Sequence, residues 1–352
     1  MGSREEAITG CLLGTAAGDA LGLAAEGLSY PRQRKLFPNL DRPRLLPGGR
    51  GMVSDDTEHA CLLAQSLIES AGDAALFQRR FARRLRIWFL GLPAGIGLAT
   101  LRACLKLLAG VPPERSGVRS AGNGPAMRSA LLGVCYGDHP EQMRRLVQAS
   151  TRITHTDPKA EAGAMAVAVA AYLSSRRLPA DEIVSEFREH LHELVDEPET
   201  LRVLDAAIAS VQRSESVTDF AAGIGAAGYV RGYILQTVPV AIHCWLSSPA
   251  DFEKAVRSVI ACGGDTDTTA AIVGAMVGAG GASIPSEWLD GICEKPCSIA
   301  WMRRLATQLS QVCETGQPER PVDSLFALRF ARNFCFALVV LAHGLRRLAP
   351  PY

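Results

Sequence analysis

Two runs of small residues constrain the fold of this 352-residue chain more than any other feature. GAMAVAVAAYL (163–173) and AAIVGAMVGAG (270–280) consist mainly of Ala, Gly and Val, which let helix backbones pack closely. Hydrophobic residues make up 48% of the chain but aromatic residues only 6%, which favours packed helices over a β-sandwich. We therefore predict an all-α fold, a single-domain orthogonal helical bundle with these two runs as core helices.

The rest of the chain shows no flexible linker between domains, so residues 1–352 are expected to form one domain. Proline- and glycine-rich stretches predict loops at 29–51 and 110–125. Within residues 321–352, the segment SLFALRFARNFCFALVVLAHGLRRL (324–348) predicts an appended helix, either amphipathic or buried.

The formal net charge of +1 gives no global field toward nucleic acid or an anionic membrane, although a local patch remains compatible with it. No nucleic-acid or membrane partner is expected, because no apolar run reaches the ~20 residues that span a bilayer and MGSREEAITG lacks a signal core. Only Cys293 and Cys297 lie close together, and no second ligand pair completes a zinc site. We expect a cytoplasmic protein.

The segment CGGDTDTTAAIVGAMVGAGG (262–281) places two aspartates one residue apart, directly before a core helix. If the helix starts near Asp267, then Asp265, Asp267 and Thr268 converge at its N-terminus, where the helix dipole favours negative charge. A simple N-cap needs only one such residue. Buried carboxylates need a compensating cation, so this segment indicates a metal site.

A second cluster of the same kind occurs far upstream in GRGMVSDDTEHACLLAQSL, where Ser54, Asp55 and Asp56 stand at the start of another helix. Taken alone, it could simply cap that helix, with Glu58 completing a capping box. Taken together, the two clusters predict four carboxylates and two hydroxyls at one point. Ligands that are all hard oxygens select Mg²⁺, Mn²⁺ or Ca²⁺, and four carboxylates can neutralise two divalent ions.

In its aspartate motifs and several further segments the chain resembles the ADP-ribosylglycohydrolases, which are related to the dinitrogenase reductase-activating glycohydrolase. The resemblance covers most of the chain, in the family's order. It shows in GCLLGTAAGDALGLAAEG (10–27), SDDTEHACLLAQSL, GNGPAMR (122–128), ITHTDPKAEAGAMAVA (153–168), YILQTVPVA (233–241) and CGGDTDTTAAIVGAMVGAGGASIPSEW (262–288). It implies an all-α fold with a dinuclear Mg²⁺ or Mn²⁺ centre that hydrolyses the bond between ADP-ribose and a modified side chain.

The resemblance also implies roles for individual residues. The metal ligands it implies are Ser54, Asp55, Asp56, Asp265, Asp267 and Thr268; many relatives have threonine where Ser54 stands here. Glu26 matches an acidic residue that reaches the metals or gates the site in some relatives, and its alternative is a solvated glutamate at a helix end. Asp19 is expected to be structural, hydrogen-bonded to a neighbouring helix end.

Substrate contacts are expected from two further segments. Gly122, Asn123 and Gly124 allow close backbone approach, and a helix opening near Pro125 would aim free N–H groups at a diphosphate. Met127 could lie against the ribose or adenine, or simply be buried. In THTDP, His155 is expected to face the site, while Asp157 either faces it too or caps the helix that Pro158 begins.

The expected chemistry follows from these residues. The ions hold the ribose hydroxyls and orient a water near the anomeric carbon, Asp56 or Glu26 takes its proton, and the bond breaks through an oxocarbenium-like state. The motifs look closest to bacterial relatives that act on ADP-ribosylarginine, with ADP-ribosylated protein as substrate and ADP-ribose as product. Three alternatives stay open: a serine or other O-linked substrate, a non-catalytic ADP-ribose-binding or structural protein, and a two-metal phosphoesterase.

Overall fold

The computed structural model describes residues 2–350, in which helices are joined by loops and only isolated β-bridges occur, so the all-α prediction is confirmed. The helices are α1 (Arg4–Gly22), η1 (Leu23–Ala25), α2 (Tyr30–Leu36), α3 (Asp55–Ser70), α4 (Ala74–Leu90), α5 (Leu98–Leu108), α6 (Pro113–Ser116), η2 (Ala126–Arg128), α7 (Ala130–Tyr136), α8 (Pro140–Arg152), α9 (Pro158–Ser175), α10 (Ala180–Leu194), α11 (Pro198–Gln212), α12 (Val217–Gly223), α13 (Ile234–Ser247), α14 (Phe252–Ile260), α15 (Thr266–Ala279), α16 (Ser286–Asp290), α17 (Ile299–Thr315) and α18 (Phe326–Arg346).

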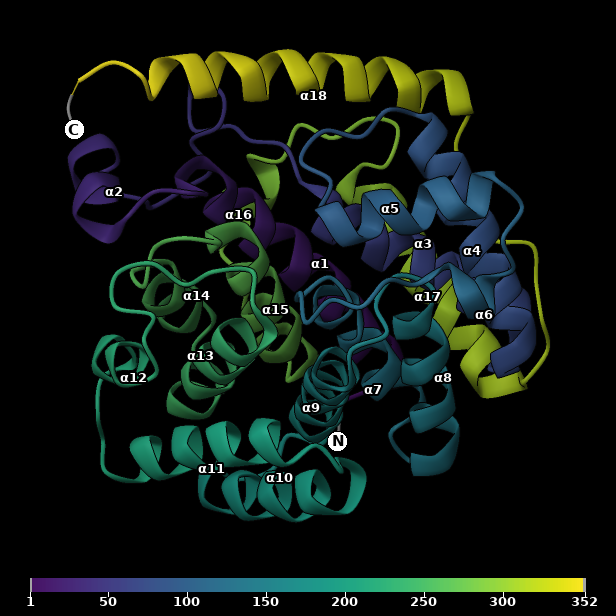
Figure 1. Ribbon diagram of the computed structural model, residues 1–352, viewed down its shortest axis with the longest axis horizontal. Coiled ribbons are helices and arrows are strands. Elements are labelled where there is room, and N and C mark those ends of the chain that lie inside the picture. The colour runs from purple at the N-terminus through teal and green to yellow at the C-terminus, as the bar shows by residue number, and fades with distance from the viewer. Residues whose placement is uncertain (1, 351–352) are drawn as a thin grey trace.

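Helices α1 and α15 pack against each other in the interior, antiparallel and with almost no side chain between them (Figure 1). A Cβ atom added to Gly14 would lie 2.1 Å from the carbonyl oxygen of Gly274, and one added to Gly22 would lie 2.2 Å from that of Thr266. Real Cβ atoms do not approach this closely, so glycine is required at these contacts. The pairing fixes the first turn of α15 beside the end of α1.

The second small-residue run forms α9, which is buried along most of its length and packs on α7, α13 and α15. A Cβ atom on Gly133 of α7 would lie only 1.8 Å from the carbonyl oxygen of Ala168 in α9. Both runs are therefore core helices, as the sequence predicted.

The two predicted loops each contain a short helix, so the expectation was wrong for α2 within 29–51 and for α6 within 110–125. Each begins with a proline in its first turn. Proline favours this position because it lacks the N–H that the first turn leaves unpaired, although the same residue also marks loops.

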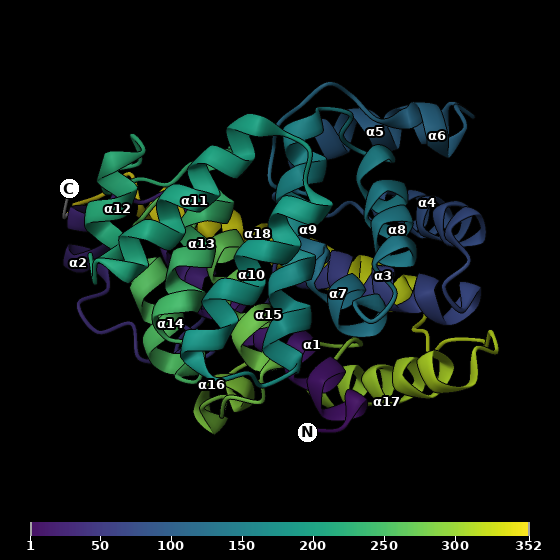
Figure 2. The same ribbon diagram turned by 90° about the horizontal axis from the view of Figure 1, so that it is seen from below.

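Helix α18 runs along one edge of the molecule, and α10 and α11 lie at the opposite edge (Figure 1). The start of α1 lies beside α17 (Figure 2), where the hydroxyl of Thr307 donates a 2.7 Å hydrogen bond to Oε1 of Glu5. The appended C-terminal helix that the sequence predicted is therefore present, and its inner face packs on the loops around α2 and α3.

Candidate active site

The two aspartate clusters meet at the first turns of α3 and α15. The Thr268 hydroxyl donates to Oδ2 of Asp56 over 3.1 Å, and the Ser54 hydroxyl donates to the same oxygen over 3.0 Å. Ser54 is the N-cap of α3 and also accepts from the Asp56 N–H at 3.3 Å. Because Thr268 and Asp56 are 212 positions apart, this contact confirms that the two segments fold together.

Asp265 is the N-cap residue of α15, but its carboxylate makes no capping hydrogen bond to the helix backbone and binds a side chain of another loop. The side-chain amide of Asn123 donates to Oδ2 of Asp265 over 2.6 Å and to the Thr237 hydroxyl over 3.0 Å. Gly264, at φ +80°, makes this turn possible, since a Cβ atom there would lie 2.0 Å from the carbonyl oxygen of Val230. Asn123, expected to touch substrate, therefore also holds Asp265 in place.

Asp19 belongs to α1 and is fully buried, and its side chain caps the N-terminus of the neighbouring helix α3. Its carboxylate accepts from the backbone N–H of Ser54 at 2.9 Å and from both the N–H and the hydroxyl of Thr57, at 3.2 and 2.5 Å. Burial raises the pKa of Asp19 to about 7 against these hydrogen bonds. The expected structural role is confirmed, and the alternative of a capping box with Glu58 does not hold, because Asp19 rather than Glu58 accepts the N–H of the N-cap Ser54.

Two carboxylate oxygens in this cluster have no hydrogen-bond partner although they are buried: Oδ1 of Asp56 and Oδ1 of Asp267. Burial and neighbouring carboxylates raise the pKa of both side chains well above the ordinary range. Among the described residues, no group of three or more His, Cys, Asp or Glu side chains is arranged to hold a metal ion by itself. The orphan oxygens and the all-oxygen donor set nevertheless fit hard divalent cations, which would satisfy those oxygens and offset the repulsion.

A cavity of about 390 Å³ opens beside the aspartates. Its lining includes ten of the residues singled out in the sequence: Glu26, Asp55, Gly122, Asn123, Gly124, Met127, His155, Asp265, Asp267 and Thr268. Ser54 and Asp56 are not among the lining residues and lie buried behind them. Sequence reasoning missed the segment 95–100, whose Leu98 and Thr100 also line the cavity; the glycines at 95 and 97, directly before α5, were the available signal.

His155 faces this cavity from just before α9. A Cβ atom on Gly122 would lie 3.1 Å from Nε2 of His155, and one on Gly124 would lie 3.0 Å from its Cε1, so the two glycines make room for the ring. Burial, together with the charge of Arg128, lowers the pKa of His155 to about 3, which leaves the imidazole neutral. Asp157 caps α9 by accepting from the Lys159 N–H at 3.0 Å.

The glycine loop does not offer the row of free N–H donors that the sequence suggested. The N–H of Gly122 donates to the Ser120 hydroxyl, that of Asn123 to the carbonyl of Gly232, and those of Ala126 and Met127 to the carbonyl of Asn123. The short 3₁₀ turn over Ala126–Arg128 accounts for the Ala126 and Met127 donors, while the loop that holds Gly232 accepts from Asn123. The loop therefore shapes the wall of the cavity, because most of its N–H groups are already paired and do not form an anion-binding site.

Glu26 lies at the cavity rim and is exposed, directly after η1. Burial of its carboxylate by the surrounding protein and the charge of Asp265 raise its pKa, and Arg347 lowers it. The backbone carbonyl of Glu26 accepts a 2.6 Å hydrogen bond from Nη1 of Arg347, at the end of α18. Glu26 is thus placed to meet a group that enters the cavity.

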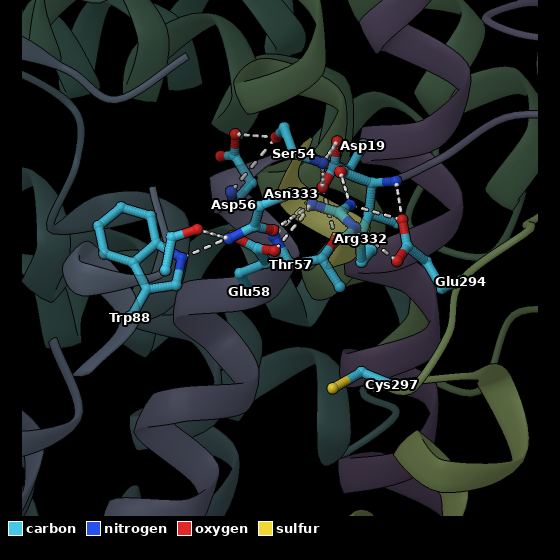
Figure 3. A network of polar contacts seen from close by, with 12 residues as sticks. Asp19, Ser54, Asp56, Thr57, Glu58, Trp88, Glu294, Cys297, Arg332 and Asn333 are labelled. Carbon is cyan, nitrogen blue, oxygen red and sulfur yellow. Dashed lines mark hydrogen bonds and ion pairs between the residues drawn. The ribbon is translucent and has the colours of Figure 1, made fainter. Parts of the chain in front are cut away.

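An ion-pair network holds the start of α3 (Figure 3). Arg332 of α18 is buried between Oε1 of Glu58, at 2.9 Å, and Oε1 of Glu294, at 2.6 Å, and it also donates to the carbonyl of Val53. Glu58 accepts a further 2.6 Å hydrogen bond from the Trp88 indole. Val53, the residue just before the Ser54–Asp56 cluster, is thereby held by a helix 279 positions downstream.

Comparison with known proteins matches this arrangement to one family. The family model of ADP-ribosylglycohydrolase matches residues 2–319. An uncharacterized protein of Archaeoglobus fulgidus is 32% identical over 88% of this chain and 97% of its own length. Human ADP-ribosylhydrolase ARH3 is 28% identical over 81% of this chain and 88% of its own.

Two further matches agree. The ADP-ribosyl-[dinitrogen reductase] glycohydrolase of Rhodospirillum rubrum is 26% identical over 80% of this chain and 88% of its own length. A solved structure titled ADP-ribosylglycohydrolase-related protein complex superposes with a TM-score of 0.65 at 28% identity, covering 89% of this chain and 100% of that one. The chain belongs to the ADP-ribosylglycohydrolase family.

Proposed function

We propose that this protein is a divalent-metal-dependent hydrolase that removes ADP-ribose from modified protein side chains, cleaving the N-glycosidic bond of ADP-ribosylarginine. Family membership supports the hydrolysis of ADP-ribose linkages in general. The arginine linkage, the two Mg²⁺ or Mn²⁺ ions and the assignment of individual residues are the finer parts of the proposal.

One observation carries the proposal: the first turns of α3 and α15 share a hydrogen bond and leave two buried carboxylate oxygens unpaired beside a cavity. Ser54, Asp55, Asp56, Asp265, Asp267 and Thr268 would hold the ions. Bound there, divalent ions would lower the pKa of a water molecule and bind ribose hydroxyls.

The protein's own groups have distinct tasks in this proposal. Asp56 or Glu26 takes a proton from the attacking water, a task that suits a carboxylate whose pKa is raised above its ordinary value by burial and neighbouring carboxylates. Glu26 has the better access, because it lines the cavity and Asp56 does not. The neutral ring of His155, and the loop of Gly122 and Gly124 that packs on it, shape the part of the cavity that receives the sugar and diphosphate.

The choice of arginine over another acceptor is tested by a linkage panel. The purified protein is incubated with Mg²⁺ or Mn²⁺ and with proteins carrying ADP-ribose on arginine, serine or cysteine, and loss of the label is measured for each. Release from arginine alone is the expected result. Release from serine alone would replace the proposed linkage and keep the hydrolase assignment.

The same reactions separate the other two alternatives. Free ADP-ribose as product supports a glycosidic hydrolase, whereas AMP or inorganic phosphate would identify a phosphoesterase. Binding of ADP-ribose without release from any substrate, with either ion present, would identify a non-catalytic member and end the proposal.

A further inference from the structure

Helix α18 lies beyond residues 2–319, the part of the chain that the family model matches. Two helices in the described range, α1 with its continuation to Ala25 and α18, are long and apolar enough to cross a membrane by length and composition, which the sequence analysis did not anticipate. The first is buried in the core, but only 17% of the apolar window in α18 is buried. An apolar helix on the outside of the molecule therefore needs an explanation.

The inner face of α18 is fixed to the protein by polar contacts. Besides the buried ion pairs of Arg332, Asn333 donates to the carbonyl of Gly91 at 2.9 Å, and a ring nitrogen of His343 bonds to the carbonyl of Leu45 at 2.6 Å. These contacts keep the helix flat along the edge of the molecule (Figure 1). A helix that crossed a membrane would have to break all of them, so α18 is positioned to lie along a surface.

The outer face of α18 is a continuous apolar surface. Large side chains recur every three or four residues at Phe326, Phe330, Phe334, Leu338, Leu341, Leu345 and Leu348, as expected for one side of a helix, and the arginines between them fall on its other sides. Leu341, Leu345 and Leu348 are 59%, 60% and 74% exposed, and Phe326, Phe330, Phe334 and Leu338 are exposed as well. Leu325 and Leu328 expose further apolar surface near the start of the helix. Contiguous exposed apolar surface of this extent marks an interaction site.

Basic residues lie beside this helix, although the whole chain has a formal net charge of only +1. Residues 31–50 contain six Lys and Arg residues against one aspartate, Asp41, which pairs with Arg42 and Arg44. Of the four arginines in 324–350, Arg329 pairs with Asp323 and Arg332 with Glu58 and Glu294, so Arg346 and Arg347 supply the basic charge at the end of α18. The two segments are neighbours, because Leu46 packs in the same small cluster as Val339 and Val340 of α18. The exposed arginines of this basic collar include Arg34, Arg42, Arg50 and Arg346.

We infer that the apolar face of α18 and its basic collar form a docking surface for an anionic membrane, with the helix lying in the plane of the lipid headgroups. An apolar face bordered by basic residues gains free energy both from burial among acyl chains and from attraction to acidic lipids. This departs from the sequence expectation of no membrane partner, which rested on the overall charge and on the lack of a spanning segment.

The charges favour a membrane over a second copy of the chain as the occupant. Pairing two α18 helices face to face would bring two basic collars together, and like charges across an interface oppose association. Helices that pair also carry opposite charges beside their apolar seam, whereas no acidic residue occurs between 324 and 350.

The test is co-sedimentation of the full-length protein with vesicles of phosphatidylcholine alone or with about one-third phosphatidylserine. We expect binding to the acidic vesicles that is at least tenfold tighter than to the neutral ones and that weakens as salt rises from 0.1 to 0.5 M, roughly the range over which screening becomes strong. Leu341→Glu/Leu345→Glu should reduce binding at least tenfold, and Arg42→Ala/Arg50→Ala should weaken only the acidic-lipid component.

A matched control places the same charges at the opposite edge, in Ser185→Glu/Gln212→Glu, on the exposed surface of α10 and α11. It should bind like the parent, and circular dichroism should show that all variants are folded. Equal binding to both vesicle types, no binding to either, or binding that survives the leucine substitutions would overturn the inference. So would a concentration-dependent dimer, by sedimentation velocity, that the leucine substitutions dissociate while vesicle binding is absent.

Discussion

The hydroxyl of Thr268 donates a hydrogen bond to Oδ2 of Asp56 over 3.1 Å and thereby joins the first turns of α15 and α3. The other oxygen of Asp56 is buried without a partner, as is Oδ1 of Asp267. The protein therefore holds carboxylates together at a place where their mutual repulsion opposes folding.

Asp267→Asn should lower kcat/KM for ADP-ribose release by at least about 100-fold, the usual cost of removing one group that stabilises charge in a transition state. The variant should remain folded, with a thermal midpoint in EDTA equal to or above that of the parent, because it removes a charge that burial, Glu26 and Asp265 disfavour. Asp157→Asn is the matched control: asparagine caps helices as well as aspartate does, so rate and midpoint should both persist. Full activity in Asp267→Asn would remove this residue from the site.

Mg²⁺ or Mn²⁺ added to EDTA-treated protein should raise the thermal midpoint, because an ion that binds only the folded state stabilises it, by about 2.7 kcal/mol at 100 times the dissociation constant. Differential scanning fluorimetry measures this shift. In Asp56→Asn/Asp267→Asn the shift should be lost. An equal shift in the double variant would place the ions elsewhere.

Gly274→Ala should destabilise the protein by about 1–3 kcal/mol, the range for overpacking, because the new methyl group would lie 2.2 Å from the carbonyl oxygen of Gly14. Gly344→Ala in α18 is the matched control, since nothing lies within 4 Å of its added Cβ atom. In a helix, that change should stabilise by about 0.5–1 kcal/mol. Urea unfolding of both variants distinguishes the close contact of α1 and α15 from a general effect of alanine.

Arg332→Met should destabilise the protein by about 3–5 kcal/mol, because it leaves Glu58 and Glu294 buried without their cation. Burial alone would lower the pKa of Arg332, but the charges of the two glutamates outweigh it and raise the pKa. The exposed Arg346, replaced in the same way, should change stability by less than about 0.5 kcal/mol. Adding Glu58→Gln and Glu294→Gln to Arg332→Met should restore part of the lost stability, measured by urea unfolding. If no stability returns, unpaired buried charge is not the cause of the loss.

Acid should destabilise the fold partly through His243, which is buried against Phe220 and far from the aspartates. Burial lowers its pKa to about 4, while its pKa in the unfolded chain is near the ordinary 6.5. Above pH 6.5 the ring is neutral in both states and its contribution to stability is complete. As pH falls from 6.5 to about 4, only the unfolded state takes up the proton, so stability is lost, on the order of 3 kcal/mol in all. His243→Gln should flatten the pH profile of unfolding in this window, and an unchanged slope would contradict the assignment.

The sequence was sufficient for those features that depend on local pattern. Runs of Ala and Gly at 163–173 and 270–280 can only be helices packed at close range, and an aspartate or serine before an apolar run marks a helix start, so the core helices and both halves of the site were predictable. Burial of the aspartates followed from their position before buried helices.

The features that could not be predicted depend on residues brought together from distant parts of the chain. In the sequence Arg332 is an ordinary charged residue of an apolar helix, and only the fold brings Glu58 and Glu294 into ion pairs with it. Asn123 stands in a glycine loop that suggested anion binding, but its amide binds Asp265, 142 positions away. Partners at such separations leave no periodic signal, because only the tertiary fold sets which loops meet.

The contact of α1 with α15 has a consequence for how the protein is made. Helix α1 finds its glycine-lined partner only after residue 279 has been synthesised, so its apolar surface stays uncovered while the intervening residues are made. Closing so long a loop is slow, and nascent chains stopped before α15 lack half of the aspartate cluster. A chain terminated before α15 would therefore lack both the core partner of α1 and the Asp265, Asp267 and Thr268 side chains that line the cavity.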